Sequence, residues 1–280
     1  MKRKEKVSII IPAYNEEKTI SLCLNSVLKQ AKFKKHVDEI IVVDDCSYDD
    51  TTKILKSYSK KIRVIRNSKN IGLSRTMNTG ISKAKGAFIC SLHADCELPK
   101  RWIENCMKLF DDKTAVVNSR IILPKGVWAG FSFWNKIFFS KFLQPRKLTC
   151  EGKCDIWRRS VLQKIGHFSE DFRVAGEDFD IYCKLKRTGY KLCSSNLLVK
   201  HIMSSHQLGF WKYFKKEFQY GEARGAILRK HRFFILFNPF AFKVWSDSRL
   251  LFALPLVITL RTIMHFVGFW KGFVTGKQEW

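Results

Sequence analysis

Acidic residues are scarce in this sequence of 280 residues, which has 25 Asp and Glu against 51 Lys and Arg. The formal net charge of +26 favours an anionic partner, which is a nucleic acid, a membrane surface or a phosphate-bearing substrate. No period of about 20 to 50 residues recurs, so a solenoid is not expected. Because 46% of the residues are hydrophobic, the chain has enough apolar side chains for a large core, which excludes a disordered protein.

Metal-binding cysteine pairs are also missing, and a signal peptide is not expected. None of the nine cysteines forms a C-x-x-C pair, and Cys150 and Cys154 have no second pair that would complete a zinc site. We therefore expect reduced thiols in a cytosolic compartment. The basic N-terminal segment turns polar after a short apolar run, which is too short for a signal-peptide core.

Short β-branched runs alternate with helical patterns in the first half of the chain. Strands are expected over Val7–Ile11, Ile40–Val43, Ile62–Ile65 and Ala87–Leu92, with helices over Thr19–Gln30, Asp50–Ser59 and Leu73–Lys83 and from Pro99. Further on, strands are expected over Cys150–Arg159 and Tyr190–Leu198, and helices from Ser160, from Gly176 and over Gly209–Lys230. This alternation predicts an α/β fold with a mostly parallel sheet, whose ligands bind beyond the carboxyl ends of the strands.

Polar, acid-rich segments follow three of these strands. They are Pro12–Glu17, Asp44–Asp50 and His93–Glu97. Clustered carboxylates repel one another unless a cation or a hydrogen-bonding ligand joins them. We therefore expect a ligand site at this edge of the sheet.

Five motifs carry a family resemblance: SIIIPAYNEE, IIVVDDCSYDDT, NIGLSRTMNTGISKAKG, SLHADCELP, and GEDFD followed by KLKRTGYKL. In this order and spacing, from Val7 to His201, the chain resembles the family 2 glycosyltransferases with the GT-A fold. The resemblance implies a Rossmann-like, mostly parallel sheet with flanking helices. It also implies transfer of a sugar from a nucleotide-sugar donor, with a UDP- or GDP-sugar expected.

The resemblance assigns a group of residues to the donor. These are Pro12, Ala13, Tyr14, Glu16, Asp45, Asn78, Ala94 and Asp95. Asp45 matches the acid that accepts a hydrogen bond from a nucleobase N–H, which an aspartate at the mouth of a strand is suited to do. Asp44 is a weaker candidate for the nucleobase contact and is expected instead to cap or brace the loop. Met77 stands where many members have an arginine, so one cation for the diphosphate is missing there, unless Arg75 supplies it.

A divalent metal, Mn²⁺ or Mg²⁺, is implied beside the diphosphate. Asp95 matches the last acid of the family's D-x-D signature and is the candidate metal ligand. His93 stands in the first position, where the family usually has aspartate, so it ligates the metal, contacts the diphosphate or weakens the metal dependence. His201 matches a downstream histidine that reaches the metal or the diphosphate.

Asp178 matches the catalytic base of the family. A single base that deprotonates the acceptor hydroxyl, together with a displaced nucleoside diphosphate, implies inversion at the anomeric carbon. Trp157, Arg158 and Glu177 are predicted to line the acceptor side. The alternative for Glu177 and Asp178 is a structural role, in which they only stabilise the N-terminus of a helix.

Residues 1–205 are predicted to form the catalytic domain, and residues 206–280 a basic, hydrophobic region that associates with a membrane. An aromatic run over Trp128–Phe142 suits membrane contact or core, or a sugar platform. The apolar segments Phe233–Trp245 and Leu250–Trp270 suit interfacial helices, one or two spans, or a soluble core or oligomer contact. In the interfacial case the cations that turn to lipid phosphates are Lys243, Arg249, Arg261 and Lys271.

The prediction is an inverting, metal-assisted glycosyltransferase at the cytoplasmic face of the cell membrane, which acts on a lipid-linked or membrane-proximal glycan. One alternative is a polyprenyl-phosphate sugar synthase, and another is a non-catalytic nucleotide-sugar-binding scaffold. Nucleic acid is not expected as a partner, because no recognised binding module is present.

Overall fold

The structure is a computed structural model that describes residues 5–124, 126, 129–131, 135–136, 152–173, 175–202, 210–232 and 249–278. Several predictions fall outside these residues. They concern Cys150, Trp128, Phe133, Trp134, Phe138, Phe139, Phe142, Phe233–Trp245 and the side chain of Arg249. The eight cysteines within the described residues are free thiols.

Eight strands form one sheet in the order β3-β2-β1-β4-β7-β6-β8-β5. Their bounds are β1 (Val7–Ala13), β2 (Val37–Asp44), β3 (Arg63–Arg66), β4 (Phe88–Leu92), β5 (Cys96–Glu97), β6 (Thr114–Ile122), β7 (Cys154–Arg158) and β8 (Lys191–His201). The first four strands of that order are parallel, as the alternating pattern predicts. β7 is antiparallel to β4 and β6, and β5 is antiparallel to β8, so the second half of the sheet is mixed.

β6 is not among the strands expected from the sequence. Its buried polar residues Asn118 and Ser119 interrupt the apolar run that would have indicated a strand. In the folded chain the indole of Trp102 donates a hydrogen bond of 2.6 Å to the Ser119 hydroxyl. A tertiary contact therefore permits polar residues inside this strand.

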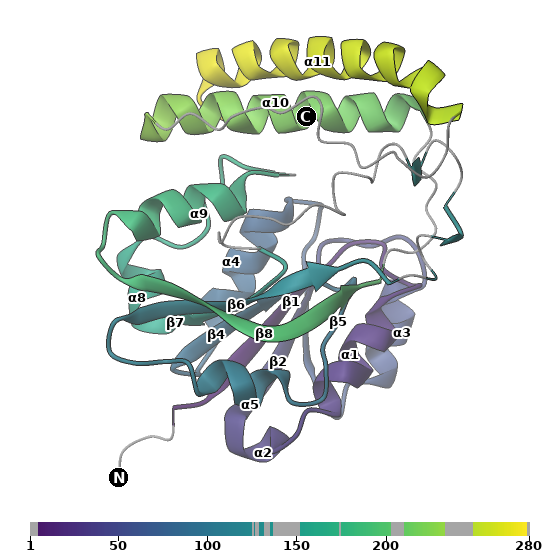
Figure 1. Cartoon of the computed structure of the whole chain (residues 1–280). Helices are drawn as coiled ribbons and strands as arrows, with labels where there is room; N and C mark the ends of the chain where they lie inside the picture. The colour runs from purple at the N-terminus through teal and green to yellow at the C-terminus, as the bar shows by residue number, and fades with distance from the viewer. Residues whose placement is uncertain are drawn as a thin grey trace.

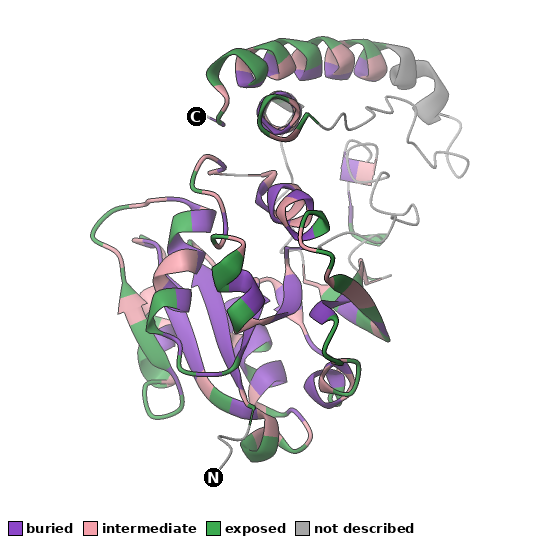
Figure 2. Ribbon diagram, turned by 90° about the vertical axis from the view of Figure 1, so that its left-hand side faces the viewer, coloured by how far each residue is buried: buried purple, intermediate pink, exposed green. Residues whose placement is uncertain are grey.

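Helices cover both faces of the sheet. They are α1 (Ile20–Leu28), α2 (Phe33–His36), α3 (Thr51–Ser57), α4 (Leu73–Lys83), α5 (Trp102–Met107), α8 (Arg159–Lys164), α9 (Glu177–Lys186), α10 (Phe210–His231) and α11 (Arg249–Thr275). Alternate residues of β1 point to opposite faces, so Ile9 and Ile11 pack in the cluster of α1 while Ile10 packs in the cluster of α4. Figure 2 shows the strands buried between these layers.

α10 and α11 form a pair that lies above the rest of the molecule, with α10 nearer to the sheet (Figure 1). Glycines bring the two backbones into contact. A Cβ on Gly225 would lie 2.0 Å from the carbonyl oxygen of Phe269, and one on Gly272 would lie 1.8 Å from that of Glu222. Only glycine permits this approach, so the crossing of the two helices is specified by small residues.

The polar side chains of α11 face α10, which corrects the prediction that Arg261 and Lys271 turn to lipid phosphates. The Arg261 guanidinium lies 3.3 Å from a carboxylate oxygen of Glu217, and the Lys271 ammonium lies 2.8 Å from Glu222. Both acids are buried, and a buried acid without a partner would be costly, so these pairs hold the helices in one register.

The opposite side of α11 is apolar and exposed, as the green outer edge of this helix in Figure 2 shows. We call this surface the outer face of α11, and it consists of Leu256, Ile263, Phe266, Val267, Trp270 and Val274. Over the described part of the chain, each helix is too short or too polar to cross a membrane.

The helix pair is tied to α9 and to the loop that precedes it. His231 of α10 lies 2.8 Å from the Asp180 carboxylate, and beyond α11 the side chain of Gln278 accepts a hydrogen bond from the Ala175 N–H. The Gln278 N–H donates to the Asp171 carbonyl oxygen at 2.8 Å. The end of the chain therefore supports the loop that leads into the G-E-D motif.

Candidate active site

Two neighbouring aspartates at the end of β2 have different tasks. Asp44 is fully buried and accepts hydrogen bonds from the Ser47 N–H and the Thr52 hydroxyl, so it braces the loop, as expected. Asp45 accepts hydrogen bonds from the N–H groups of Ile71 and Gly72 and from the Asn67 amide. A carboxylate has about four acceptor positions, so Asp45 keeps capacity for one further donor.

The loop after β1 is joined to the loop after β2. Asn15 has a left-handed backbone, with a φ of 57°, and its side-chain oxygen accepts the Tyr48 N–H while its own N–H donates to Ser47. The rings of Tyr14 and Tyr48 meet edge to face at 6.1 Å, and the Tyr48 side chain is 83% exposed. Pro12 and Ala13 are buried beneath them. Two aromatic rings therefore stand above the carboxyl ends of β1 and β2.

Asp95, His201 and Lys153 meet at the end of β4. The His201 Nε2 lies 2.6 Å from the Asp95 carboxylate, and the Lys153 ammonium lies 3.4 Å from the same oxygen. The Lys153 ammonium is also 3.1 Å from His201 Nε2. Asp95 and His201 come together because β5 pairs with β8, where Cys96 stands opposite His201.

Charge explains the titration of this cluster. Burial alone would raise the pKa of Asp95, but Lys153 and His201 outweigh burial and hold that pKa well below its ordinary value. Burial lowers the pKa of Lys153, but the charge and hydrogen bond of Asp95, together with Cys96, outweigh burial and raise this pKa to about 12. Burial, followed by Lys153, lowers the pKa of His201. At neutral pH the cluster is therefore a carboxylate, an ammonium and a neutral imidazole.

His93 is close to this cluster, but the structure joins Asp95 to His201 instead. The His93 N–H donates to the Lys153 carbonyl oxygen at 2.8 Å, and burial and Lys153 lower the pKa of the imidazole to about 3. Within the ranges that the structure describes, no three His, Cys, Asp or Glu side chains are grouped to hold a metal. Ala94 is buried between His93 and Asp95.

A second lysine approaches from above. Lys216 belongs to α10 and is half-buried; burial and the positive charge of Lys153 lower its pKa. Glu16 is also close enough to Asp95 to feel its charge. Burial, with a contribution from Asp95, raises the pKa of Glu16 to about 7. Neither Lys153 nor Lys216 belongs to a motif that would have marked it in the sequence. Only the position of α10 above the sheet brings Lys216 near Asp95.

Glu177 and Asp178 open α9 beside the loop that carries Lys153. A Cβ on Gly152 would lie 2.9 Å from the Asp178 Cβ, so this glycine permits the loop to pass close to the acid. Glu177 is buried, one of its carboxylate oxygens has no hydrogen-bond partner, and burial and then Asp178 raise its pKa to about 8. Asp178 is half-exposed, so it is the more accessible acid of the two.

The structure overturns the acceptor-side placement of Trp157 and Arg158. Trp157 is fully buried in the core and packs edge to face on Phe168. Arg158 stands opposite Phe88, the first residue of β4, and therefore lies at the far edge of the sheet from Asp95. Its guanidinium donates to the Asp111 carbonyl oxygen there.

Three residues of the α4 motif also face away from the donor edge. The Asn78 side chain donates to the Phe168 carbonyl oxygen at 2.8 Å and accepts the Phe168 N–H, so it holds a loop. Met77 packs in the core, and Arg75 pairs with Glu170 on the surface at 3.2 Å. Neither Met77 nor Arg75 lies among the groups around Asp95.

Comparison with known proteins identifies the family. Residues 8–166, more than half of the chain, match the family described as Glycosyl transferase family 2. The chain belongs to glycosyl transferase family 2. It is a transferase that depends on a nucleotide-sugar donor, and its fold is GT-A.

Similar proteins act on glycans carried by lipids. A dolichyl N-acetyl-alpha-D-glucosaminyl phosphate 3-beta-D-2,3-diacetamido-2,3-dideoxy-beta-D-glucuronosyltransferase of Methanococcus voltae is 27% identical over 97% of this chain and 98% of its own length. The UDP-Glc:alpha-D-GlcNAc-diphosphoundecaprenol beta-1,3-glucosyltransferase WfgD of Escherichia coli is 34% identical over 51% of this chain and 53% of its own length.

Among solved structures, the mannosyltransferase PcManGT of Pyrobaculum calidifontis, in complex with GDP-Man and Mn²⁺, superposes with a TM-score of 0.59. The match covers 94% of this chain and 74% of that one, at 20% identity. This similarity supports the GT-A fold.

Proposed function

We propose that this enzyme transfers a sugar, with inversion, from a UDP- or GDP-sugar to a hydroxyl of a lipid-linked glycan. The observation that carries the proposal is the meeting of Asp95, His201 and Lys153 at the sheet edge, next to the loop that packs on Asp178. This arrangement places a binding site for the donor diphosphate close to a group that can act as a base. The names of the two relatives support the lipid-linked acceptor.

The nucleoside binds across the first two strand ends. The free acceptor capacity of Asp45 suits a nucleobase N–H, and the rings of Tyr14 and Tyr48 offer apolar faces for the base and ribose. Pro12 and Ala13 form the floor of this subsite, and Glu16 borders its diphosphate end. Asn78 does not contact the donor directly in this proposal; it positions the loop that contains Phe168.

The diphosphate lies against Lys153, Lys216 and the Asp95–His201 pair. These two ligands fit a divalent metal, because such an ion is commonly held by one or two protein groups and completed by substrate phosphates. Such a metal neutralises charge on the leaving diphosphate when it is bound. Asp95 and His201 would hold it, and His93 would support their loop. Lys153 and Lys216 supply fixed positive charge to the same oxygens.

Asp178 accepts the proton of the acceptor hydroxyl. The hydroxyl oxygen then forms a bond to the anomeric carbon while the bond from that carbon to the diphosphate oxygen breaks, so the electron pair leaves with the nucleoside diphosphate. Glu177, whose raised pKa keeps it largely protonated at neutral pH, leaves Asp178 as the charged acid of the pair. One displacement inverts the configuration.

The helix pair is proposed to seat the enzyme on the cytoplasmic face of a membrane. The outer face of α11 is apolar and exposed, and the net charge of +26 favours anionic lipid. Residues 206–280 thereby act as a membrane-associating region attached to the catalytic domain of residues 1–205.

Turnover of UDP- and GDP-sugars with a lipid-linked acceptor and Mn²⁺ or Mg²⁺ tests the proposal, with Asp178→Asn beside the wild type. Loss of the base is expected to lower kcat about 100- to 10,000-fold, while the affinity for the nucleoside diphosphate stays within about twofold. The matched control Asp112→Asn removes an exposed acid and is expected to keep full turnover. Equal activity of Asp178→Asn and the wild type would refute the assignment of the base.

A further inference from the structure

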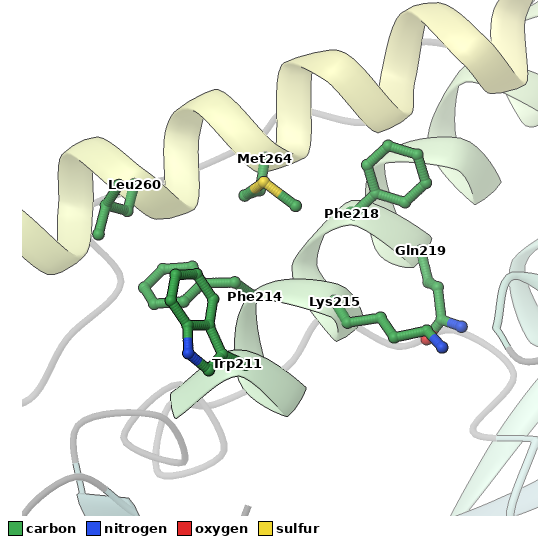
Figure 3. Close-up of a pocket in the computed structure, with 7 residues that line it drawn as sticks. All are labelled: Trp211, Phe214, Lys215, Phe218, Gln219, Leu260 and Met264. Carbon is green, nitrogen blue, oxygen red and sulfur yellow. The ribbon is translucent and has the colours of Figure 1, made fainter. Parts of the chain in front are cut away.

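A groove between α10 and α11 lies outside the catalytic edge described above. It has a volume of about 460 Å³ and is lined by Trp211, Phe214, Lys215, Phe218 and Gln219 of α10 and by Leu260 and Met264 of α11. Figure 3 shows Leu260 and Met264 reaching from α11 towards the aromatic side chains of α10. The walls are therefore apolar rings and aliphatic chains, with a single cationic side chain.

The helix packing explains why a groove exists here. The backbone contacts begin where Gly268 of α11 meets the Phe218 carbonyl and Gly221 of α10 meets the His265 carbonyl. One turn before Phe218, α10 carries Phe214 in place of glycine. Its large ring keeps the two backbones apart there, so an open space remains at this end of the helix pair.

We propose that this groove binds the isoprenoid chain of a lipid-phosphate-linked acceptor, with the Lys215 ammonium at its rim paired to the phosphate next to the chain. This inference rests on the proposed function and adds the subsite for the lipid. The methyl-branched, unsaturated chain matches the aromatic and thioether walls, and the two polar residues of the lining, Lys215 and Gln219, are left for the phosphate end of the lipid.

Charge complementarity selects a phosphate-bearing lipid. Lys215 is exposed and lines the groove together with Gln219, as the sticks in Figure 3 show. Lys212, one turn before Lys215, is exposed as well and lies on the same side of the helix. No acid lines this groove among the described residues, so a phosphate meets no repulsion there.

The place of the groove suits an acceptor. Lys216, the next residue of α10, faces the Asp95–Lys153 cluster, so the rim of the groove is adjacent to the helix surface that covers the catalytic edge. The outer face of α11 borders the groove on its other side and is proposed to contact the membrane. A lipid could therefore enter from the membrane and present its glycan to Asp178.

Binding of farnesyl phosphate to the full chain, measured by calorimetry without any sugar donor, tests the inference. Met264→Trp fills the groove and is expected to weaken binding at least about 10-fold. The matched control Ile263→Trp adds the same ring one residue away, on the outer face of α11, and is expected to bind as the wild type does. Lys215→Met is expected to weaken farnesyl phosphate about 10-fold and to leave farnesol unchanged.

Three results would overturn the inference: no binding by the wild type, equal loss in Met264→Trp and Ile263→Trp, or equally tight binding of hexadecyl phosphate, which would make the groove a general lipid site. If Met264→Trp does not fold, as judged by circular dichroism, Lys215→Met decides alone. If farnesyl phosphate binds as expected but the protein shows no sugar-transfer activity, the lipid site is supported and the proposed function is refuted. If the protein transfers sugar and Met264→Trp does not change farnesyl phosphate binding, the proposed function is supported and the lipid site is refuted.

Discussion

Positive charge at the donor edge is concentrated on a few residues around one carboxylate. Lys153, Lys216 and the neutral imidazole of His201 surround Asp95, which is the only acid in direct contact with Lys153 among the described residues. The cluster keeps an excess of positive charge. An anion such as a diphosphate would balance it.

Lys153→Met is expected to weaken binding of a nucleoside diphosphate about 10- to 100-fold, because a charge-assisted hydrogen bond of about 1.5–3 kcal/mol is lost. Binding of the parent nucleoside is expected to stay the same, since it lacks the phosphates. Titration calorimetry with UDP, GDP and the nucleosides measures both. The control Lys200→Met removes an exposed lysine that pairs with Glu97, and a loss of UDP or GDP affinity in that variant as large as in Lys153→Met would contradict the assignment.

Glu177 makes stability depend on pH. Its folded pKa of about 8 lies above the ordinary 4.5, so its stabilising contribution is complete below pH 4.5 and is lost as the pH rises through 8. Glu177→Gln cannot ionise. The free energy of unfolding of the wild type is therefore expected to fall relative to that of the variant by about 4 kcal/mol between pH 5 and pH 9.

Urea denaturation at pH 5, 7 and 9 measures this difference. Glu170→Gln, which changes an exposed acid, serves as the control and is expected to give no pH-dependent difference. A constant difference between wild type and Glu177→Gln over this range would show that Glu177 is charged in the folded protein.

At the scale of elements, the α10–α11 pair depends on contact between backbones. The glycines of both helices recur at four-residue spacing, and α10 and α11 run in the same direction, since Gly221 meets His265 and Gly225 meets Phe269. The buried pairs Glu217–Arg261 and Glu222–Lys271 allow one register only. The pair is therefore a rigid unit over the catalytic edge.

Gly272→Ala is expected to destabilise the protein by about 1–3 kcal/mol, although alanine favours helix by about 1 kcal/mol. The added Cβ would lie 1.8 Å from the backbone oxygen of Glu222, which cannot move as a side chain could. Chemical denaturation, with hydrogen exchange of α11, measures the loss. Gly126→Ala adds the same methyl where nothing lies within 4 Å, so it is expected to cause no loss.

At the scale of the whole molecule, charge and apolar surface favour the same partner. The chain carries +26, and the outer face of α11 leaves large apolar side chains in solvent, with Trp270 60% exposed. Burial of apolar surface gives a membrane-bound helix its affinity, and basic charge attracts it to anionic lipid.

The double variant Val267→Glu/Trp270→Glu is expected to lower binding to vesicles that contain anionic lipid at least about 10-fold. Wild-type binding is expected to weaken as salt rises, because the electrostatic part is screened. Co-sedimentation with vesicles measures both effects. The control Ser57→Glu/Ser59→Glu makes the same charge change at the end of α3, so an equal loss there would leave net charge as the whole cause.

The fold was predictable where its signals are local. β1, β2 and β4 are apolar runs of the length of a strand, and each is followed by the polar segment that forms the donor edge. β6 was not predicted because its polar residues are bonded only in the folded chain. Trp157 and Arg158 were misplaced because the direction of β7, which decides the edge of the sheet at which its residues lie, could not be read from the sequence.

The amino-acid sequence by itself determined the βα alternation, the acidic strand ends, the family and the candidate base, because two-residue and 3.6-residue periods and motif spacing are properties of neighbouring residues. Only the tertiary structure decided which charges meet. His201 reaches Asp95 through the pairing of β5 with β8, Lys153 and Lys216 come to Asp95 from separate elements, and Arg261 turns to Glu217 instead of lipid. These contacts join residues that are far apart in the chain. A buried charge without a partner is costly, so the folded structure favours the arrangement in which buried charges are paired.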